Sequence, residues 1–195
     1  MAKSLVQEQF GATAAHYLTS KPHAKGKSLE RLVELVTPQS TWRMLDVATG
    51  AGHTAYAFAP HHFDSIAAFL EEARRVLKSG ATLAIADNIV PSGSVGDYVN
   101  AFERFRDPSH LRAWTMEEWR AALAGHGFAI AHEESASKSI EFSSWASRHD
   151  PIMQALLKAM LAETTPAAKS FLRPEESGGE LTFCLSEGLF IAKRT

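Results

Sequence analysis

The chain has 195 residues, of which 45% are hydrophobic, so it can bury one good core and has the usual size of a single domain. Lys and Arg total 20 against 22 for Asp and Glu, a balance that argues against nucleic acid as the main partner. A single cysteine, Cys184, and apolar runs too short to span a bilayer predict a soluble cytoplasmic protein.

The first elements in chain order are two helices, a strand and a glycine turn. Residues 7–17 are expected to form a short helix, and apolar residues at helical spacing predict a second helix that Pro38 ends. Residues 43–48 are a short apolar strand, and a turn with two glycines connects it to a helix at residues 53–60. Such a turn suits a nucleotide-like cofactor, because its backbone and the N–H groups of the helix face one point.

A helix and a buried strand follow this unit. Asp64 is expected to cap the N-terminus of the helix, and Gly80 fits its C-terminal stop. Residues 82–86 form a buried strand that ends at Asp87. Open α/β sheets bind ligands at the carboxyl ends of their strands, although Asp87 could also simply cap the loop that follows.

The rest of the chain continues to alternate helices with strands. The expected elements are a helix at 98–105, a helix that starts at the capping box of Thr115 and Glu118, a strand at 128–132, helical material at 143–171, and strands at 181–185 and 189–192. This alternation predicts one α/β domain.

Five segments together resemble the class I S-adenosylmethionine-dependent methyltransferases, and among them the small-molecule group related to the quinone-biosynthesis C-methyltransferases. They are RMLDVATGAGHTA at 43–55, FLEEARRVLKSG at 69–80, Asp87-Asn88, RDPSH at 106–110, and the segment from Trp114-Thr115 to Trp119. The resemblance extends over nearly the whole chain and implies a Rossmann-like fold. It also implies S-adenosylmethionine as the methyl donor and a small-molecule acceptor, which could be aromatic or quinone-like.

The resemblance also implies which residues hold the cofactor. In such enzymes the glycine turn receives the amino-acid end of S-adenosylmethionine, a role that falls here on Asp46, Ala48, Gly50, Gly52, His53 and Thr54. Phe10 and Tyr17 resemble the N-terminal segment that closes over the cofactor, and an aromatic ring near the sulfonium would gain cation–π attraction. The alternatives are a glycine turn with a purely structural role and aromatic residues that only pack against the rest of the protein.

His110 is the candidate general base, because it lies in a polar loop after the core strands and histidine titrates near neutrality. Methyl transfer needs mainly positioning, and a base is required only if the acceptor must lose a proton. The alternative is a structural lid in which Asp107 caps a turn. The adjacent His61 and His62 lack a third ligand at a usual spacing, so no metal site is predicted.

Compared with the family pattern, about two βαβ units, or roughly 60 residues, are absent after the glycine turn. Residues 61–63 can span only about 10 Å, against about 17 Å for a strand, so the helices before and after them cannot both hold their family positions. We therefore expect a reduced or rearranged sheet, or a chain break near Pro60 and His61 if the family sheet order is kept. A shortened remnant with a rearranged or domain-swapped core, a designed deletion and omitted residues are the open explanations.

One methyltransferase-like domain is expected over residues 1–195. Its parts are a helical lid at 1–37, the glycine-turn unit at 42–60, the remaining sheet and helices at 64–135 and 180–193, and substrate-side helical insertions at 97–114 and 143–171. Two other functions stay open. One is a catalytically impaired remnant that binds partners or forms homodimers. The other is a nicotinamide-dependent oxidoreductase, which fits the G-x-G-x-x-A pattern but lacks the acid expected about 20 residues later.

Overall fold

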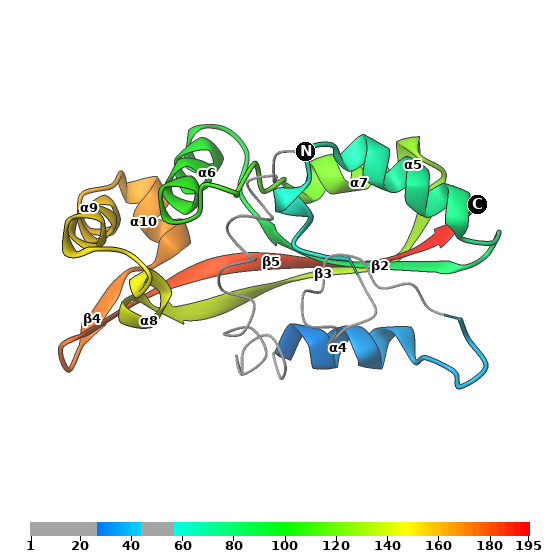
Figure 1. Cartoon of the computed structure of the whole chain (residues 1–195), viewed down its shortest axis with the longest axis horizontal. Helices are drawn as coiled ribbons and strands as arrows, with labels where there is room; N and C mark the ends of the chain where they lie inside the picture. Colours follow the sequence, from blue (N-terminus) through cyan, green and yellow to red (C-terminus); the bar gives the residue numbers. More distant parts are fainter. Residues whose placement is uncertain (1–26, 44–56) are drawn as a thin grey trace, which may run out of the picture.

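The computed structural model describes residues 27–43 and 57–195, and these residues are built around one five-stranded mixed sheet with the path β1-β2-β5-β3 (Figure 1). The strands are β1 (Ala57–Phe58), β2 (Thr82–Ile89), β3 (Phe128–Glu141), β4 (Glu175–Ser177) and β5 (Glu180–Arg194). The β1–β2 pair is parallel, whereas β2, β3 and β4 all pair antiparallel with β5. The predicted α/β class is confirmed.

Helices cover both faces of this sheet. They are α4 (Lys27–Val36), the 3-10 helix η1 (Pro60–His62), α5 (Ile66–Val76), α6 (Ser94–Arg106), α7 (Met116–Gly125), α8 (Phe142–Ala146), α9 (Pro151–Ala162) and α10 (Pro166–Leu172). The capping box of Thr115 and Glu118 starts α7 as predicted. The predicted cap of α5 is wrong by one residue, because the hydroxyl of Ser65, not the carboxylate of Asp64, accepts the N–H of Ala68.

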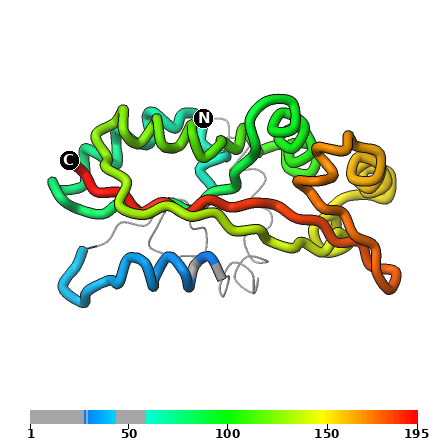
Figure 2. The backbone as a smooth tube through the Cα atoms, turned by 180° about the vertical axis from the view of Figure 1, so that it is seen from behind, coloured from blue at the N-terminus to red at the C-terminus, as the bar shows by residue number. Residues whose placement is uncertain are grey.

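Two apolar layers fix α5, α7 and α4 to opposite faces of the sheet, as the two views show (Figures 1 and 2). On one face, Trp119 of α7 and Leu70 of α5 pack with Phe190 of β5. On the other face, Leu32 and Val36 of α4 pack against small and branched strand residues. No helix in the described ranges has both the length and the hydrophobicity to cross a bilayer.

A separate core lies under the outer half of the long β3–β5 ribbon. It joins α6, α8, α9 and α10, which gather at one end of the molecule (Figure 1). The fully buried Phe102 of α6 stacks on Trp145 with ring centroids 4.9 Å apart and meets Phe183 edge-on at 5.6 Å. Helices far apart in the sequence therefore share one aromatic core, and their assignment to the substrate side stays a prediction.

The predicted helix at residues 53–60 is wrong over its described part. Ala57 and Phe58 pair in parallel with Ile85 and Ala86, and Ala59 then adopts a left-handed conformation with φ 58° before η1. The β1–α5–β2 segment is thus a βαβ unit, the connection that parallel strands require.

The predicted chain break is also absent, because the backbone continues from Ala59 through Pro60 with hydrogen bonds to both sides of the 3-10 turn. The reach argument assumed a helix that ends at the far edge of the sheet. A strand that ends at the near edge needs only a short turn to reach α5. Within the described residues, β1 pairs with β2 over two positions, Ala57 and Phe58.

Candidate functional site

Polar side chains meet at the carboxyl end of β2, although the strand around them is apolar. Asp87 is only 2% exposed, and its Oδ1 atom contacts the Nδ1 atom of His61 and accepts the His61 backbone N–H at 3.3 Å. The 3-10 turn of η1 brings His61 over this strand end. A buried carboxyl group needs such partners, because burial without them is costly.

The two members of this pair are shifted in opposite directions by burial. Burial raises the pKa of the Asp87 carboxyl well above its ordinary value. Burial, assisted by the positive charge of Lys138, lowers the pKa of His61 to about 4. Both shifts favour a pair without net charge, in which Asp87 and His61 share the proton between Oδ1 and Nδ1.

His110 lies beside this pair and is 1% exposed. Its Nε2 atom is 2.8 Å from Oδ1 of Asn100. The Asn100 amide is oriented by Ala113, whose N–H donates to Oδ1 at 2.7 Å and whose carbonyl accepts from Nδ2 at 3.1 Å. Nε2 of His110 therefore carries the proton, and Nδ1 has a free lone pair with which no described residue hydrogen-bonds.

The titration of His110 differs from the sequence-based expectation. Burial, followed by the charges of His61, His62 and Arg104, lowers its pKa to about 3. The premise that this histidine titrates near neutrality is wrong, because the loop packs it into the interior. His110 is consequently uncharged across the physiological pH range.

The loop before His110 is held by a second set of hydrogen bonds. Asp107 accepts the backbone N–H of Ser109 at 3.0 Å and its hydroxyl at 2.6 Å, and its other oxygen lies 2.9 Å from Arg148. Burial alone would raise the pKa of Asp107, but the bonds from Ser109 and Arg148 hold it at about 2. Asp107 does cap this turn, and the turn places His110.

The three imidazoles form a compact group, which we call the histidine cluster: His61, His62 and His110. Their ring centroids are 4.3 Å apart for His61 and His62, 5.1 Å for His61 and His110, and 6.3 Å for His62 and His110. Sequence reasoning considered the first two only as metal ligands. Within residues 27–43 and 57–195, no three His, Cys, Asp or Glu side chains are arranged to hold a metal ion.

Of the residues predicted to act in the site, His110 is the one that the structure describes. The predicted cofactor residues lie outside the described residues, namely Phe10, Tyr17, Asp46, Ala48, Gly50, Gly52, His53 and Thr54. A surface depression of about 550 Å³ lies over β3 and α7, between Arg120 and Glu133, and contains none of the polar groups described above. The chemistry of the described part is therefore concentrated at the end of β2.

Replacing Asn100 with Ala is expected to lower the free energy of unfolding by about 2 kcal/mol or more. The change leaves the Nε2–H of His110 and both backbone groups of Ala113 without their partner, and an unsatisfied buried group costs about 1–3 kcal/mol. Urea unfolding measures the loss. Gln39→Ala is the matched control, because this exposed amide makes one hydrogen bond, to the carbonyl of Thr37. Equal losses in the two variants would contradict the role of Asn100.

Comparisons with known proteins find relatives named as methyltransferases, while no established family profile matches the chain. The uncharacterized methyltransferase YcgJ of Bacillus subtilis (strain 168) is 24% identical, with 71% of this chain and 78% of YcgJ covered. The uncharacterized protein YafE of Escherichia coli (strain K12) is 28% identical, with 64% of this chain and 61% of YafE covered.

Solved structures share the fold. BH2331 from Bacillus halodurans C-125, named as a candidate methyltransferase, superposes with a TM-score of 0.66 at 28% identity and covers 71% of this chain and 68% of its own. The crystal structure of YcgJ superposes with a TM-score of 0.65 at 24% identity and covers 71% of this chain and 61% of its own. The match therefore spans less than two thirds of that YcgJ chain.

The YcgJ alignment also bears on the missing segment. It extends over 196 residues but includes 71% of this chain, which is about 138 of its 195 residues, so roughly 58 positions face a gap in this chain. That number agrees with the roughly 60 residues expected from two βαβ units. In sequence and in fold, the chain is therefore similar to proteins named as methyltransferases, which agrees with the predicted resemblance to that class of enzymes.

Proposed function

We propose that the protein transfers a methyl group from S-adenosylmethionine to a small-molecule acceptor. The observation that carries the proposal is the combined likeness to YcgJ and BH2331 in sequence and fold. The polar cluster at the carboxyl end of β2 adds support, because open α/β sheets bind their ligands there. The quinone-related subgroup and the methyl acceptor are part of the proposal.

In this proposal the glycine turn and the N-terminal segment hold the cofactor. The residues concerned are Asp46, Ala48, Gly50, Gly52, His53 and Thr54 in the turn, with Phe10 and Tyr17 closing over it. When bound, S-adenosylmethionine supplies a methyl group already activated by its sulfonium. The protein then contributes mainly positioning and the exclusion of water.

The described residues supply a place for the proton that an acceptor loses. Asn100 holds Nε2 of His110, so that Nδ1 is the atom left to accept a proton. The lowered pKa keeps this nitrogen unprotonated at neutral pH.

Calorimetric titration of the full chain with S-adenosylhomocysteine tests the proposal, because this product analogue binds at the cofactor site without reaction. We expect one molecule to bind per chain and Asp46→Asn to weaken binding by at least about tenfold, the effect of about 1.4 kcal/mol. Asp64→Asn, a change at an exposed carboxylate, should bind as the wild type does. NADH serves as the ligand of the oxidoreductase alternative and is expected not to bind.

A remnant that only binds partners or oligomerises is the second candidate. The gap of roughly 58 positions against YcgJ favours it, because that many residues correspond to about two βαβ units. Absence of S-adenosylhomocysteine binding by a folded, dimeric protein would support the remnant and refute the enzyme. Light scattering on the same samples gives the oligomeric state.

A further inference from the structure

Two glutamates of the polar cluster come from different elements and lie next to the same strand end. Glu103 of α6 is 9% exposed, and Glu187 of β5 is 4% exposed. Asn88 connects them: its Nδ2 atom donates to Oε2 of Glu103 at 3.3 Å, and in the sheet register Asn88 stands opposite Glu187. We call Glu103 and Glu187 the glutamate pair.

Each member of the glutamate pair has one oxygen without a donor. Within the described part of the chain, no group donates to Oε1 of Glu103 or to Oε2 of Glu187, although both atoms are buried. Lys138 lies 2.9 Å from Oε1 of Glu187 and leaves Oε2 free. Buried carboxyl oxygens in native proteins almost always have a donor, so these two atoms point to a partner that donates hydrogen bonds.

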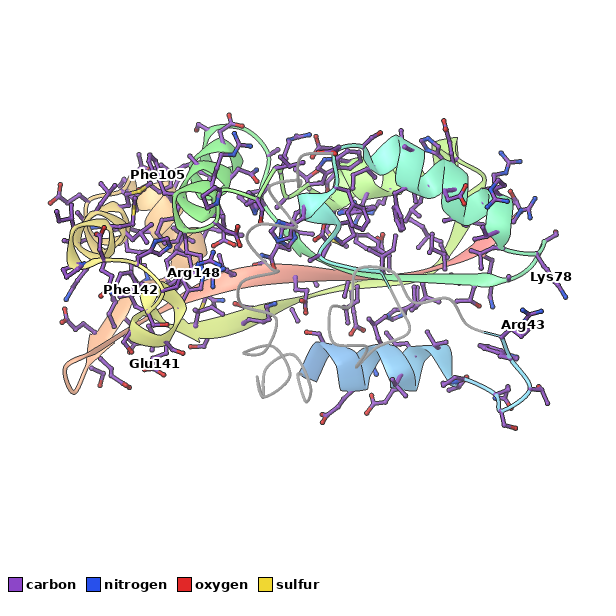
Figure 3. All side chains as sticks on the ribbon, in the orientation of Figure 1. Arg43, Lys78, Phe105, Glu141, Phe142 and Arg148 are labelled. Atoms are coloured by element: carbon purple, nitrogen blue, oxygen red, sulfur yellow. The ribbon has the colours of Figure 1, made fainter. Side chains whose placement is uncertain are left out.

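The charges around the pair identify the kind of partner. Asp87, whose Oδ2 atom is also buried without a donor, adds a third carboxyl group to the same region. Lys138 is the cation in direct contact with the pair, and Arg148, which lies beside α6 near the sheet (Figure 3), is bound to Asp107. A negatively charged ligand would face repulsion from these carboxyl groups, whereas a cation with N–H donors would satisfy them.

The ordinary reading is that Glu103 stays protonated and serves only structure. Burial raises its pKa to about 7, which Lys138 and Arg106 offset only in part. A protonated Glu103 donates a single O–H, so it leaves at least one of Oε2 of Glu187 and Oδ2 of Asp87 without a donor. Two buried acceptors on facing elements are therefore better explained by a shared ligand than by one neutral side chain.

We infer that the glutamate pair binds the ammonium group of an amine, which is the methyl acceptor of this protein. The inference rests on the proposed function, because the amine is a methyl acceptor only if the protein is a methyltransferase. It names a cationic acceptor in place of a quinone-like one. An ammonium group offers three N–H donors on one nitrogen. It can therefore serve Oε1 of Glu103 and Oε2 of Glu187 at once, in the place where the sheet ends.

The test compares 2-phenylethylammonium with its neutral isostere 2-phenylethanol as probes for the full chain. Ligand-observed NMR titration gives the dissociation constants, with and without S-adenosylhomocysteine. We expect the ammonium to bind at least about tenfold more tightly than the alcohol, a difference of about 1.4 kcal/mol. Glu103→Gln and Glu187→Gln should each remove most of this preference, and Glu180→Gln, an exposed change on the same strand, should keep it.

Lys138→Met guards against variants that fail to fold. It removes the cation that competes for Glu187, so it should strengthen the binding of 2-phenylethylammonium. Equal binding of the two probes, binding of neither, or weaker ammonium binding in Lys138→Met would overturn the inference. Failure of the proposed function shows separately, as loss of S-adenosylhomocysteine binding while the preference for the ammonium persists.

Discussion

Between pH 6.5 and 4.5, the free energy of unfolding should fall by about 3 kcal/mol less in His110→Gln than in the wild type. The folded pKa of His110 is about 3, whereas an unfolded histidine titrates near 6.5. Its contribution to stability is therefore complete above pH 6.5 and is lost as the pH falls toward 3. Two pH units within this window at about 1.36 kcal/mol each give the expected difference. Gln keeps an N–H that Asn100 can accept.

Urea unfolding of wild type and variant at several pH values gives this difference directly. His61 and His62 also have lowered pKa values and act in the same direction, so the comparison with the variant isolates His110.

For Glu103→Gln we expect the difference in stability from the wild type to change with pH in the opposite direction. Burial raises the pKa of Glu103 to about 7, so its contribution is present below the unfolded value and is lost as the pH rises through 7. Difference curves of the same sign for both variants would contradict the burial of one of the two groups.

Local signals in the sequence identified most elements of the described part. The capping box before α7 and the apolar face of α5 depend on residues within one or two turns, so they were visible without the structure. The lengths of the strands could not be predicted in this way. The predicted strands at 181–185 and 189–192 are one strand, because Gly188 lets β5 pass close to β2, where a Cβ atom would lie 2.9 Å from Cγ2 of Ile89. The need for glycine at this position comes from the neighbouring strand β2, so the local sequence of β5 does not reveal it.

The beginning of β1 shows the same limit. Residues 57–60 read as the end of a helix, and β1 gains its hydrogen bonds only by pairing with Ile85 and Ala86 of a strand more than twenty residues later. The prediction placed these residues in a helix that follows the glycine turn. Tertiary pairing overrides such a local pattern when the segment is short.

The candidate site was predicted in part. His110 and Asp87 were singled out, since one stands in a polar loop and the other ends a buried strand. Asn100, Glu103 and Glu187 were not, because a polar residue on an amphipathic helix or on an alternating strand normally faces water. Their burial follows from the packing of α6 against the sheet end.

Truncating Phe102 to Ala is expected to lower the free energy of unfolding by about 3–5 kcal/mol, the usual cost for a buried phenylalanine. The ring is fully buried between Trp145 and Phe183, so its removal leaves a cavity at the centre of the helical core. Phe105 lies three residues later on the same helix and is 49% exposed. Phe105→Ala is therefore the matched control and should cost less than about 1 kcal/mol.

The same variant tests whether the helical core supports the site. Phe102 directly precedes Glu103, and both belong to the helix that also presents Asn100 to His110. Loss of the packing against Trp145 should loosen α6 and weaken the binding of 2-phenylethylammonium, while Phe105→Ala should leave it unchanged. Urea unfolding and the NMR signal of the Trp145 indole N–H report stability and packing together. If the two variants lose equal stability, α6 is not anchored by Phe102. If Phe102→Ala loses stability but binds the probe normally, the glutamate pair is positioned by the sheet end and Asn88 alone.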